Sequence, residues 1–151
     1  MNDSLAQAAL QEAEKAFLEG EIPVGGVVFD TKTQEKICVA RNRVEKDENP
    51  SAHCEMLLIE KACRLKKSKN LSGCSVYVTL EPCTMCAAAL SLARVDRVYF
   101  GAYDLKSGGI EQGCCVFNQP TIHHKPEVYG GFKEKEASFL LKMFFEKLRK
   151  K

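Results

Sequence analysis

The sequence predicts a layered α/β domain in which a mixed sheet of about five strands carries helices on both faces. Segments with helical and with strand periodicity alternate along the chain. Within residues 75–101, an apolar strand, a short alanine-rich helix and a second apolar strand follow one another at the spacing of a parallel crossover. The first and last long segments are amphipathic, as helices covering a sheet are.

The first elements predicted are a helix and a β-hairpin. Residues 3–19 place their apolar side chains on one helical face, and Gly20 ends the segment. Residues 23–30 read as a buried strand, and residues 36–41 as its partner across a short polar turn.

The middle of the chain predicts a helix, a strand and a second helix. After a polar loop, a helix is expected over residues 51–67, with Ser51 as its N-cap. Residues 75–80 are rich in β-branched and aromatic side chains and form a strand. Pro82 follows in a good position to open a helix over residues 83–93.

The last third predicts two strands, a long loop and a helix. Residues 95–101 complete the parallel crossover. Residues 102–126 are irregular, and a loop of this length in a small domain is often functional. A short strand is expected over residues 127–130, followed by a helix over residues 132–150.

Length and composition predict a single domain over residues 1–151. Hydrophobic residues make up 45% and charged residues 28%, which is ordinary for a soluble protein. The N-terminus lacks the features of a signal peptide and no apolar run reaches membrane-spanning length, so we expect a cytoplasmic protein without a membrane partner. In that compartment, eight cysteines indicate metal binding or free thiols rather than disulfides.

The net charge of +2 is too small to indicate a nucleic-acid partner, but its distribution is uneven. Residues 132–151 contain seven basic and three acidic side chains. This local surplus can contact phosphate groups. A solvated basic end also suits the C-terminus of a helix, and on charge alone we favour this second interpretation.

One imidazole and two thiols are spaced as ligands of a single zinc ion. His53 lies near the start of one predicted helix, and Cys83 and Cys86 lie at the start of the next. Residues at positions i and i+3 share a helix face, so both sulfurs can reach one ion. The positive end of the helix dipole favours thiolates there. Three protein ligands with a fourth position left for water are typical of a catalytic zinc site.

Glu55, two residues after His53, is the candidate general base for that water. Two thiolates neutralise the charge of Zn²⁺, so the water is less acidified than at an all-histidine site and a nearby carboxylate becomes necessary. Once protonated, the same carboxyl group can protonate a ring nitrogen and then a departing amine. These requirements fit hydrolytic deamination of an aminopurine or aminopyrimidine. In a regular helix the two side chains would diverge, so His53 must lie near the cap.

The alternative is a zinc site that only stabilises the fold. It requires a fourth ligand, for which four side chains are available: His123, His124, Cys74 and Cys114. None has the spacing of a zinc knuckle, and Glu55 would have no role. The catalytic interpretation is therefore favoured.

Longer motifs surround these residues: EIPVG at 21–25, ARN at 40–42, HCE at 53–55, VTLEPCTMC at 78–86 and FGAYDLKSG at 100–108. On them the chain resembles the bacterial-type tRNA-specific adenosine deaminases, of the cytidine deaminase-like superfamily. The resemblance implies a three-layer α/β/α fold and a homodimer that converts adenosine to inosine at the wobble position of a tRNA anticodon. It implies one zinc ion per subunit, held by His53, Cys83 and Cys86, with Glu55 as the proton shuttle.

The resemblance also implies four substrate-binding residues: Asn42, Val24, Asp104 and His123. Each has a plainer interpretation, because Asn and Asp form turns, Val fills cores and loop histidines are commonly solvated. Phe144 and Phe145 lie on a helical stripe, so we expect core packing there rather than base stacking. Cys54, where the family usually has Ala, and residues 109–113 depart from the family pattern.

Two other functions compete with tRNA editing. A small-molecule deaminase of guanine, cytosine or cytidine would share all of the metal chemistry and differ only in its loops. A non-catalytic, zinc-stabilised RNA-binding subunit would not need Glu55. The basic C-terminal segment and the open loops favour an RNA substrate.

Overall fold

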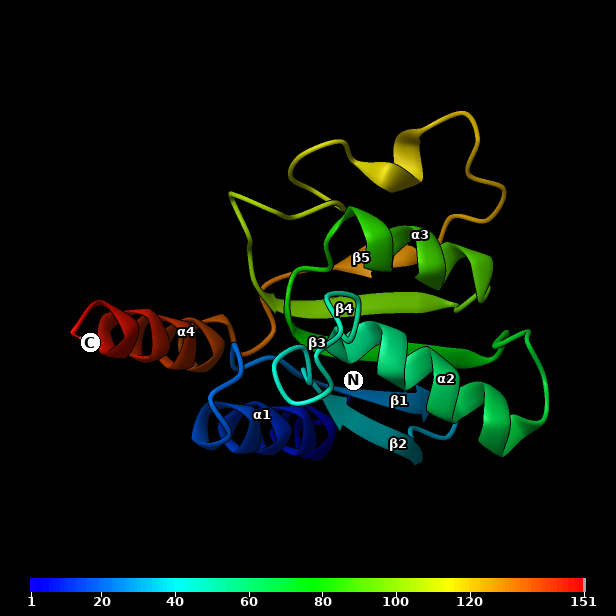
Figure 1. The fold of residues 1–151 in the computed structure, drawn as a ribbon. Coiled ribbons are helices and arrows are strands. Elements are labelled where there is room, and N and C mark those ends of the chain that lie inside the picture. The colour runs from blue at the N-terminus through cyan, green and yellow to red at the C-terminus, as the bar shows by residue number, and fades with distance from the viewer. Residues whose placement is uncertain (151) are drawn as a thin grey trace.

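A five-stranded mixed sheet is the middle layer of the computed structural model, which describes residues 1–150 (Figure 1). The strands are β1 (Gly25–Asp30), β2 (Lys36–Arg41), β3 (Cys74–Leu80), β4 (Arg97–Ala102) and β5 (Glu127–Tyr129). The helices are α1 (Asp3–Leu18), α2 (Cys54–Lys66), α3 (Thr84–Leu92) and α4 (Glu134–Arg149), with one 3₁₀ turn at Val116–Asn118. Lys151, one of the basic residues of the C-terminal segment, lies outside the described residues.

The sheet has the spatial order β2-β1-β3-β4-β5. Strand β1 pairs antiparallel with both β2 and β3, which confirms the predicted hairpin. Strands β3, β4 and β5 are parallel, which confirms the predicted crossover through α3. The carboxyl ends of β3 and β4 therefore meet at one edge of the sheet, where α/β proteins bind their ligands.

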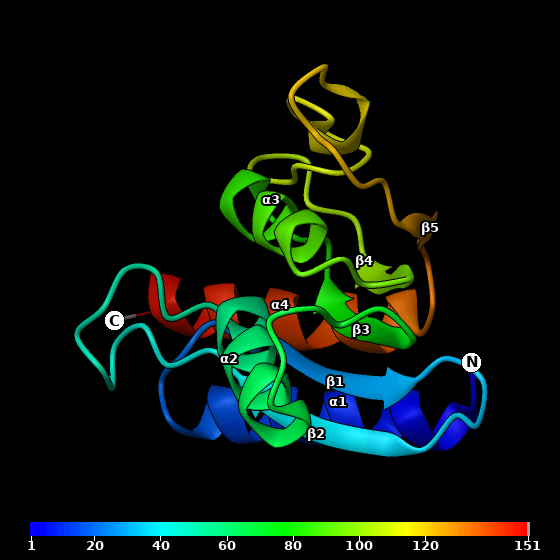
Figure 2. The same ribbon diagram turned by 90° about the vertical axis from the view of Figure 1, so that its right-hand side faces the viewer.

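Alternating side chains build a core on each face of the sheet. Val28, Val76 and Val98 point to the face that α2 and α3 cover. Phe29 and Tyr77 belong to the cluster on the opposite face, against α1. Helix α4 packs beside α1 on that second face, as the two views together show (Figure 2). The predicted helices on both faces are thereby confirmed.

Gly25, at the start of β1, lies where α1 crosses the sheet with no room for a side chain. A Cβ atom there would lie 2.1 Å from the Ala9 carbonyl oxygen and 2.5 Å from the Ala13 nitrogen. Because both atoms belong to the helix backbone, Gly25→Ala is expected to lower the free energy of unfolding by about 3 kcal/mol. Denaturant unfolding measures this. In Gly73→Ala the Cβ meets open space at a φ of +89°, so the loss should be only about 1 kcal/mol; equal losses would contradict the clash.

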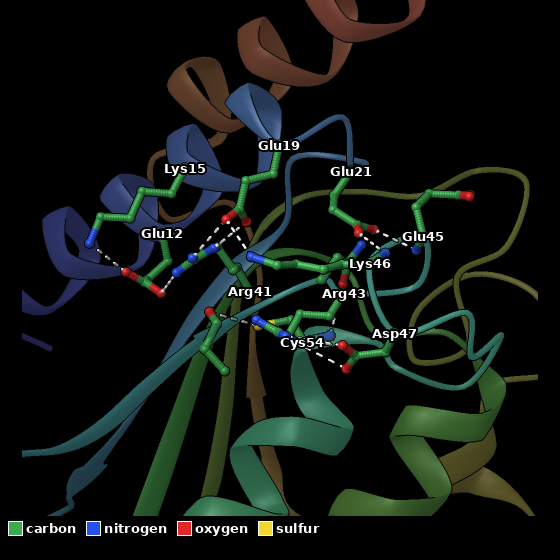
Figure 3. A network of polar contacts seen from close by, with 12 residues as sticks. Glu12, Lys15, Glu19, Glu21, Arg41, Arg43, Glu45, Lys46, Asp47 and Cys54 are labelled. Carbon is green, nitrogen blue, oxygen red and sulfur yellow. Dashed lines mark hydrogen bonds and ion pairs between the residues drawn. The ribbon is translucent and has the colours of Figure 1, made fainter.

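An ion-pair network ties α1 to β2 (Figure 3). Arg41 donates to Glu19 at 2.8 Å and to Glu12 at 2.9 Å, and Lys46 donates to Glu19 at 3.2 Å. The hydrogen bond from Arg41 is the main cause that lowers the pKa of Glu19 from 4.5 to about 2. The network joins the helix to the strand that leads into the loop at residues 42–50.

The lowered pKa of Glu19 predicts how the stability of the protein depends on pH. The pKa of Glu19 is lower in the folded than in the unfolded state, so its contribution is present above about pH 4.5 and is lost as the pH falls towards 2. Glu19→Gln should lower the Tm slightly at neutral pH, because the pair is solvent-exposed, and the difference should shrink below pH 4.5. Thermal melts across this range measure it. Equal differences at pH 7 and pH 3 would contradict this linkage.

The start of α2 differs from the sequence-based expectation. Ser51 is not the N-cap of α2, which begins at Cys54 with His53 as its cap residue. The Ser51 hydroxyl instead donates to the Asn49 side chain at 2.9 Å, within the preceding turn. Within residues 1–150, no helix is both long and apolar enough to cross a membrane.

Candidate metal centre and cavity

Helices α2 and α3 begin side by side, and each begins with a residue of the candidate metal group. His53 is the N-cap of α2 and Cys83 the N-cap of α3. Neither side chain makes the capping hydrogen bond usual at this position, so both are free to point away from their own helix. Cys86 lies in the first turn of α3 and is buried. The sheet edge therefore carries all three side chains, as the sequence predicted.

The spacing of the three ligand atoms fits a tetrahedral metal. His53 Nδ1 lies 3.6 Å from the sulfur of Cys83 and 3.6 Å from the sulfur of Cys86. Nitrogen and sulfur ligands bound to one zinc ion at usual lengths lie about 3.5–3.8 Å apart. All three atoms lie within 4.8 Å of one another. The donor set and its geometry thus fit Zn²⁺.

The electrostatics of the site favour a thiolate. The pKa of Cys83 is lowered to about 4, first because the Cys86 thiol donates a hydrogen bond to it and then because His53 lies beside it. Burial opposes this shift. A thiolate is the form of cysteine that binds metals, so Cys83 suits the role of ligand.

The side chains proposed as a fourth ligand lie elsewhere. Within residues 1–150, the metal-binding group at this site consists of His53, Cys83 and Cys86 alone. The Cys114 sulfur contacts the Thr84 hydroxyl at 3.4 Å, and His124 Nε2 lies 2.7 Å from the Val95 carbonyl oxygen. A closed structural site is therefore disfavoured, since His53 and Cys83 also face an open cavity.

Glu55 lies in the first turn of α2 and lines the same cavity as His53 and Cys83. It is 4% exposed, and burial raises its pKa from 4.5 to about 7. A carboxyl group of this kind exchanges a proton more readily near neutral pH than an exposed one. Because His53 occupies the cap position, Glu55 shares a cavity with it despite a separation of two residues.

The cavity has a volume of about 590 Å³, within the usual range for ligand sites. Besides His53, Cys83 and Glu55, seven apolar side chains line it: Ile22, Val24, Val44, Leu80, Phe144, Phe145 and Leu148. A planar heterocycle can be enclosed by such walls with its reacting edge at the polar end.

Three of the four residues predicted to bind substrate line this cavity. Asn42 and Val24 are buried, and Asp104 is partly exposed. The Asn42 side-chain oxygen accepts from the Cys54 N–H at 2.8 Å, which caps the start of α2, and its amide nitrogen donates to the Ile22 carbonyl. Asp104 accepts from two backbone N–H groups of its own turn. These residues therefore have structural roles in addition to the predicted ones.

Of the histidine and phenylalanine residues considered in the sequence, some line the cavity and others do not. His123 is exposed and does not line the cavity. The contact of His124 with the Val95 carbonyl oxygen ties this loop to the turn between α3 and β4. Phe144 is buried against Phe17, as expected. Phe145 was expected in the core but is 42% exposed and borders the cavity. The apolar stripe of α4 therefore covers the core at Phe144 and borders the cavity at Phe145 and Leu148.

Two buried carboxylates of the cavity wall were missed by the sequence analysis. Glu21 and Glu81 are 1% and 2% exposed, and both accept hydrogen bonds from backbone N–H groups. The signal was a glutamate close to a proline between two predicted elements, in EIP and EPC. That signal does not distinguish a buried carboxylate from a solvated one.

The chain is similar to a known family and to individual proteins of that family. The family model of the cytidine and deoxycytidylate deaminase zinc-binding region matches residues 1–102. The tRNA-specific adenosine deaminase of Rickettsia bellii is 43% identical over 141 residues, covering 93% of this chain and 97% of the relative. That of Aquifex aeolicus is 46% identical over 143 residues, covering 95% of this chain and 93% of the relative.

Solved structures are similar as well. A structure from work on A-to-I editing by tRNA deaminases at the wobble position of transfer RNA has a TM-score of 0.90 and 41% identity. The match covers 93% of this chain and 100% of that one. A guanine deaminase from Nitrosomonas europaea has a TM-score of 0.74 at 19% identity, which is a likeness of fold alone.

Proposed function

The chain belongs to the tRNA-specific adenosine deaminases, and on this premise we propose that it hydrolyses adenosine to inosine at the wobble position of a tRNA anticodon. The observation that carries the proposal is the convergence of His53, Cys83 and Cys86 into one metal-binding group, two of whose members, His53 and Cys83, line a cavity with Glu55. Relatives of more than 40% identity along nearly the whole chain supply the substrate class. A target adenine must leave its stack to enter such a cavity, and a loop nucleotide does so at low cost.

His53, Cys83 and Cys86 would hold one zinc ion, which when bound supplies a Lewis acid and an activated water. Glu55 accepts the proton of the attacking water and delivers it to the purine ring nitrogen. It then accepts the proton of the new hydroxyl group on the purine carbon and delivers it to the departing amine, whose bond to that carbon breaks. Ammonia and inosine leave, so the carboxylate ends as it began. The apolar wall keeps other water away from the base, because its side chains cannot hold ordered solvent.

We propose that Asn42 and Val24 contact the flipped base, since both are buried and line the cavity. Asp104 lies at its edge and is placed to contact the backbone of the anticodon loop. His123 is outside the cavity wall, so its contact would be with a more distant part of the tRNA. The basic segment after Phe132 would contact phosphates.

We further propose that residues 1–151 act as one deaminase domain and that two copies form a homodimer. Helix α3 exposes an apolar stripe at helical spacing, with Leu92 81% and Met85 37% exposed. A second copy would cover this stripe. Sedimentation of Leu92→Glu should show a monomer where the unchanged chain is a dimer. We also propose a cytoplasmic location, where a tRNA substrate is found.

The substrate class is tested by ammonia release. Zinc-loaded protein would be incubated with a tRNA that carries adenosine at the wobble position, and separately with guanine, cytosine, cytidine and adenosine. Release from the tRNA alone supports the proposal. Release from a free base, with the tRNA unchanged, would make this chain a small-molecule deaminase. Retained zinc without turnover on any substrate would indicate a non-catalytic subunit.

A further inference from the structure

Two loops border the cavity on opposite sides, and each is held by one buried carboxylate. We define rim loop A as residues 42–50, which contribute Asn42, Val44 and Glu45 to the cavity wall, and rim loop B as residues 103–113, which contribute Asp104 and Ser107. We propose that Glu21 and Glu81 are positioning residues that set the backbone conformation of rim loops A and B, and thereby the affinity of the cavity for its substrate.

Glu81 lies between the last residue of β3 and the metal ligand Cys83, and rim loop B folds around its carboxylate. One oxygen accepts from the Asp104 N–H at 3.1 Å. The other accepts from three successive N–H groups, at 3.2, 2.9 and 3.0 Å: those of Ile110, Glu111 and Gln112. Both ends of rim loop B are therefore fixed by one side chain.

Glu21 does the same for rim loop A from the opposite side. One of its oxygens accepts from the Glu45 N–H at 3.1 Å and the other from the Lys46 N–H at 2.8 Å. Figure 3 shows the Glu21 side chain directed at these two backbone nitrogens and away from the ion pairs of Glu19. The segment after α1 and rim loop A are thus joined without a basic side chain.

The carboxylates of Glu21 and Glu81 bind backbone N–H groups and not basic side chains. Among the ion pairs of the described residues, neither Glu21 nor Glu81 takes part. A salt bridge would fix a side chain, whereas several N–H groups bound to one carboxylate fix the main chain itself. Both carboxylates are buried, and a buried carboxylate that loses its donors is costly, so water would have to replace a loop that leaves it. Each rim loop therefore has one strongly preferred conformation.

Gly108 provides independent evidence of how closely rim loop B surrounds Glu81. A Cβ atom at Gly108 would lie 2.7 Å from the carboxyl carbon of Glu81 and 2.5 Å from the Asp104 carbonyl oxygen. Gly108 also forms a β-bridge with Cys83, beside the metal group. Gly108→Ala thus separates the loop from an unchanged carboxylate.

Hydrogen exchange of individual amides, followed by NMR, tests the positioning directly and needs no substrate. In Glu81→Gln one acceptor oxygen becomes a donor, so the amides of rim loop B should exchange about tenfold faster while those of Glu45 and Lys46 are unchanged. Glu21→Gln should give the reverse pattern. Each variant is the control for the other. Equal acceleration in both loops, or none in the loop concerned, would overturn the proposal.

Gly108→Ala tests the same contact and leaves the Glu81 carboxylate unchanged. It should accelerate exchange in rim loop B to a similar extent, and in a folded double variant the two effects should not add. Additive effects, or unchanged protection of Ile110, Glu111 and Gln112 in Gly108→Ala, would show that Glu81 does not hold the loop.

The consequence for binding rests on the proposed function and is read from kinetics. Each glutamine variant should raise KM for tRNA about tenfold and change kcat by less than about threefold, because the metal group and Glu55 stay in place. The absorption bands of the Co²⁺-substituted protein should be unchanged. Inactivity of the unchanged protein on tRNA would refute the proposed function and leave the exchange result standing.

Asp96→Asn is the matched control for a purely structural effect. The Asp96 carboxylate accepts from the Thr31 hydroxyl at 2.8 Å and from the Gly73 N–H at 3.0 Å, at the opposite end of the sheet. This variant should lower the Tm without changing KM or exchange in either rim loop. A rise in KM equal to that of the glutamate variants would mean that general destabilisation explains the effect.

Discussion

Glu55→Gln is expected to abolish deamination while the protein stays folded and keeps its zinc. The substitution preserves the size of the side chain but removes the group that accepts the proton of water and delivers it to the leaving amine. General acid–base catalysis contributes up to about 10⁴-fold, so kcat should fall by about that factor. Because Glu55 is not a ligand, the zinc content measured by atomic emission should equal that of the unchanged protein.

Glu60→Gln provides the control for this variant. Glu60 lies on the same helix, is exposed and pairs with Arg64 at 2.7 Å. Its loss should leave kcat unchanged, since exposed pairs within a helix contribute only a few tenths of a kcal/mol. A Glu55→Gln protein that keeps more than about a tenth of the activity would contradict the proposed proton shuttle, because the contribution would be below that of a general base.

Cys86→Ala should remove the zinc ion together with the activity. The Cys86 sulfur is buried and lies 3.6 Å from His53 Nδ1, so no nearby water can take its place without opening the core. We expect a fall in zinc affinity larger than the roughly 10–100-fold loss caused by removing an outer partner of a ligand. Competition with a chromogenic chelator measures the affinity, and thermal unfolding should show a lower Tm.

Cys63→Ala is the corresponding control. Cys63 is partly buried on α2, packs against the main core cluster and lies outside the metal group. Its removal should leave the zinc affinity unchanged and reduce stability by the modest amount expected for a small cavity. Loss of zinc from this variant, or full zinc binding by Cys86→Ala, would show that the ligand set is wrong.

The sequence was sufficient to predict the elements because their periodicity is local. Strands β3 and β4 are mainly apolar, and α1 keeps one apolar face, so neighbours in the sequence determine each assignment. The metal group was also predictable, since Cys83 and Cys86 share one turn of a helix. His53 could be assigned as the third ligand because histidine is one of the few residue types that bind zinc.

What the sequence could not show depends on contacts between distant segments. Ser51 looked like an N-cap, but the side chain of Asn42, twelve positions before Cys54, caps the first N–H of α2 instead. Phe145 looked like a core residue because it is apolar and lies on a helical stripe. The sequence does not show that this part of the helix borders the cavity instead of packing on the sheet. The burial of Glu81 depends on a loop some thirty residues later in the chain.

The central claim is that this site deaminates one adenosine of a tRNA, and position-specific sequencing tests it most directly. Zinc-loaded protein and Glu55→Gln of equal zinc content would be incubated with a tRNA carrying adenosine at the wobble position, and the product reverse-transcribed. Inosine is read as guanosine. We predict complete conversion of the wobble adenosine by the unchanged protein and none by the variant. An unconverted tRNA, or equal conversion by both proteins, would contradict the claim.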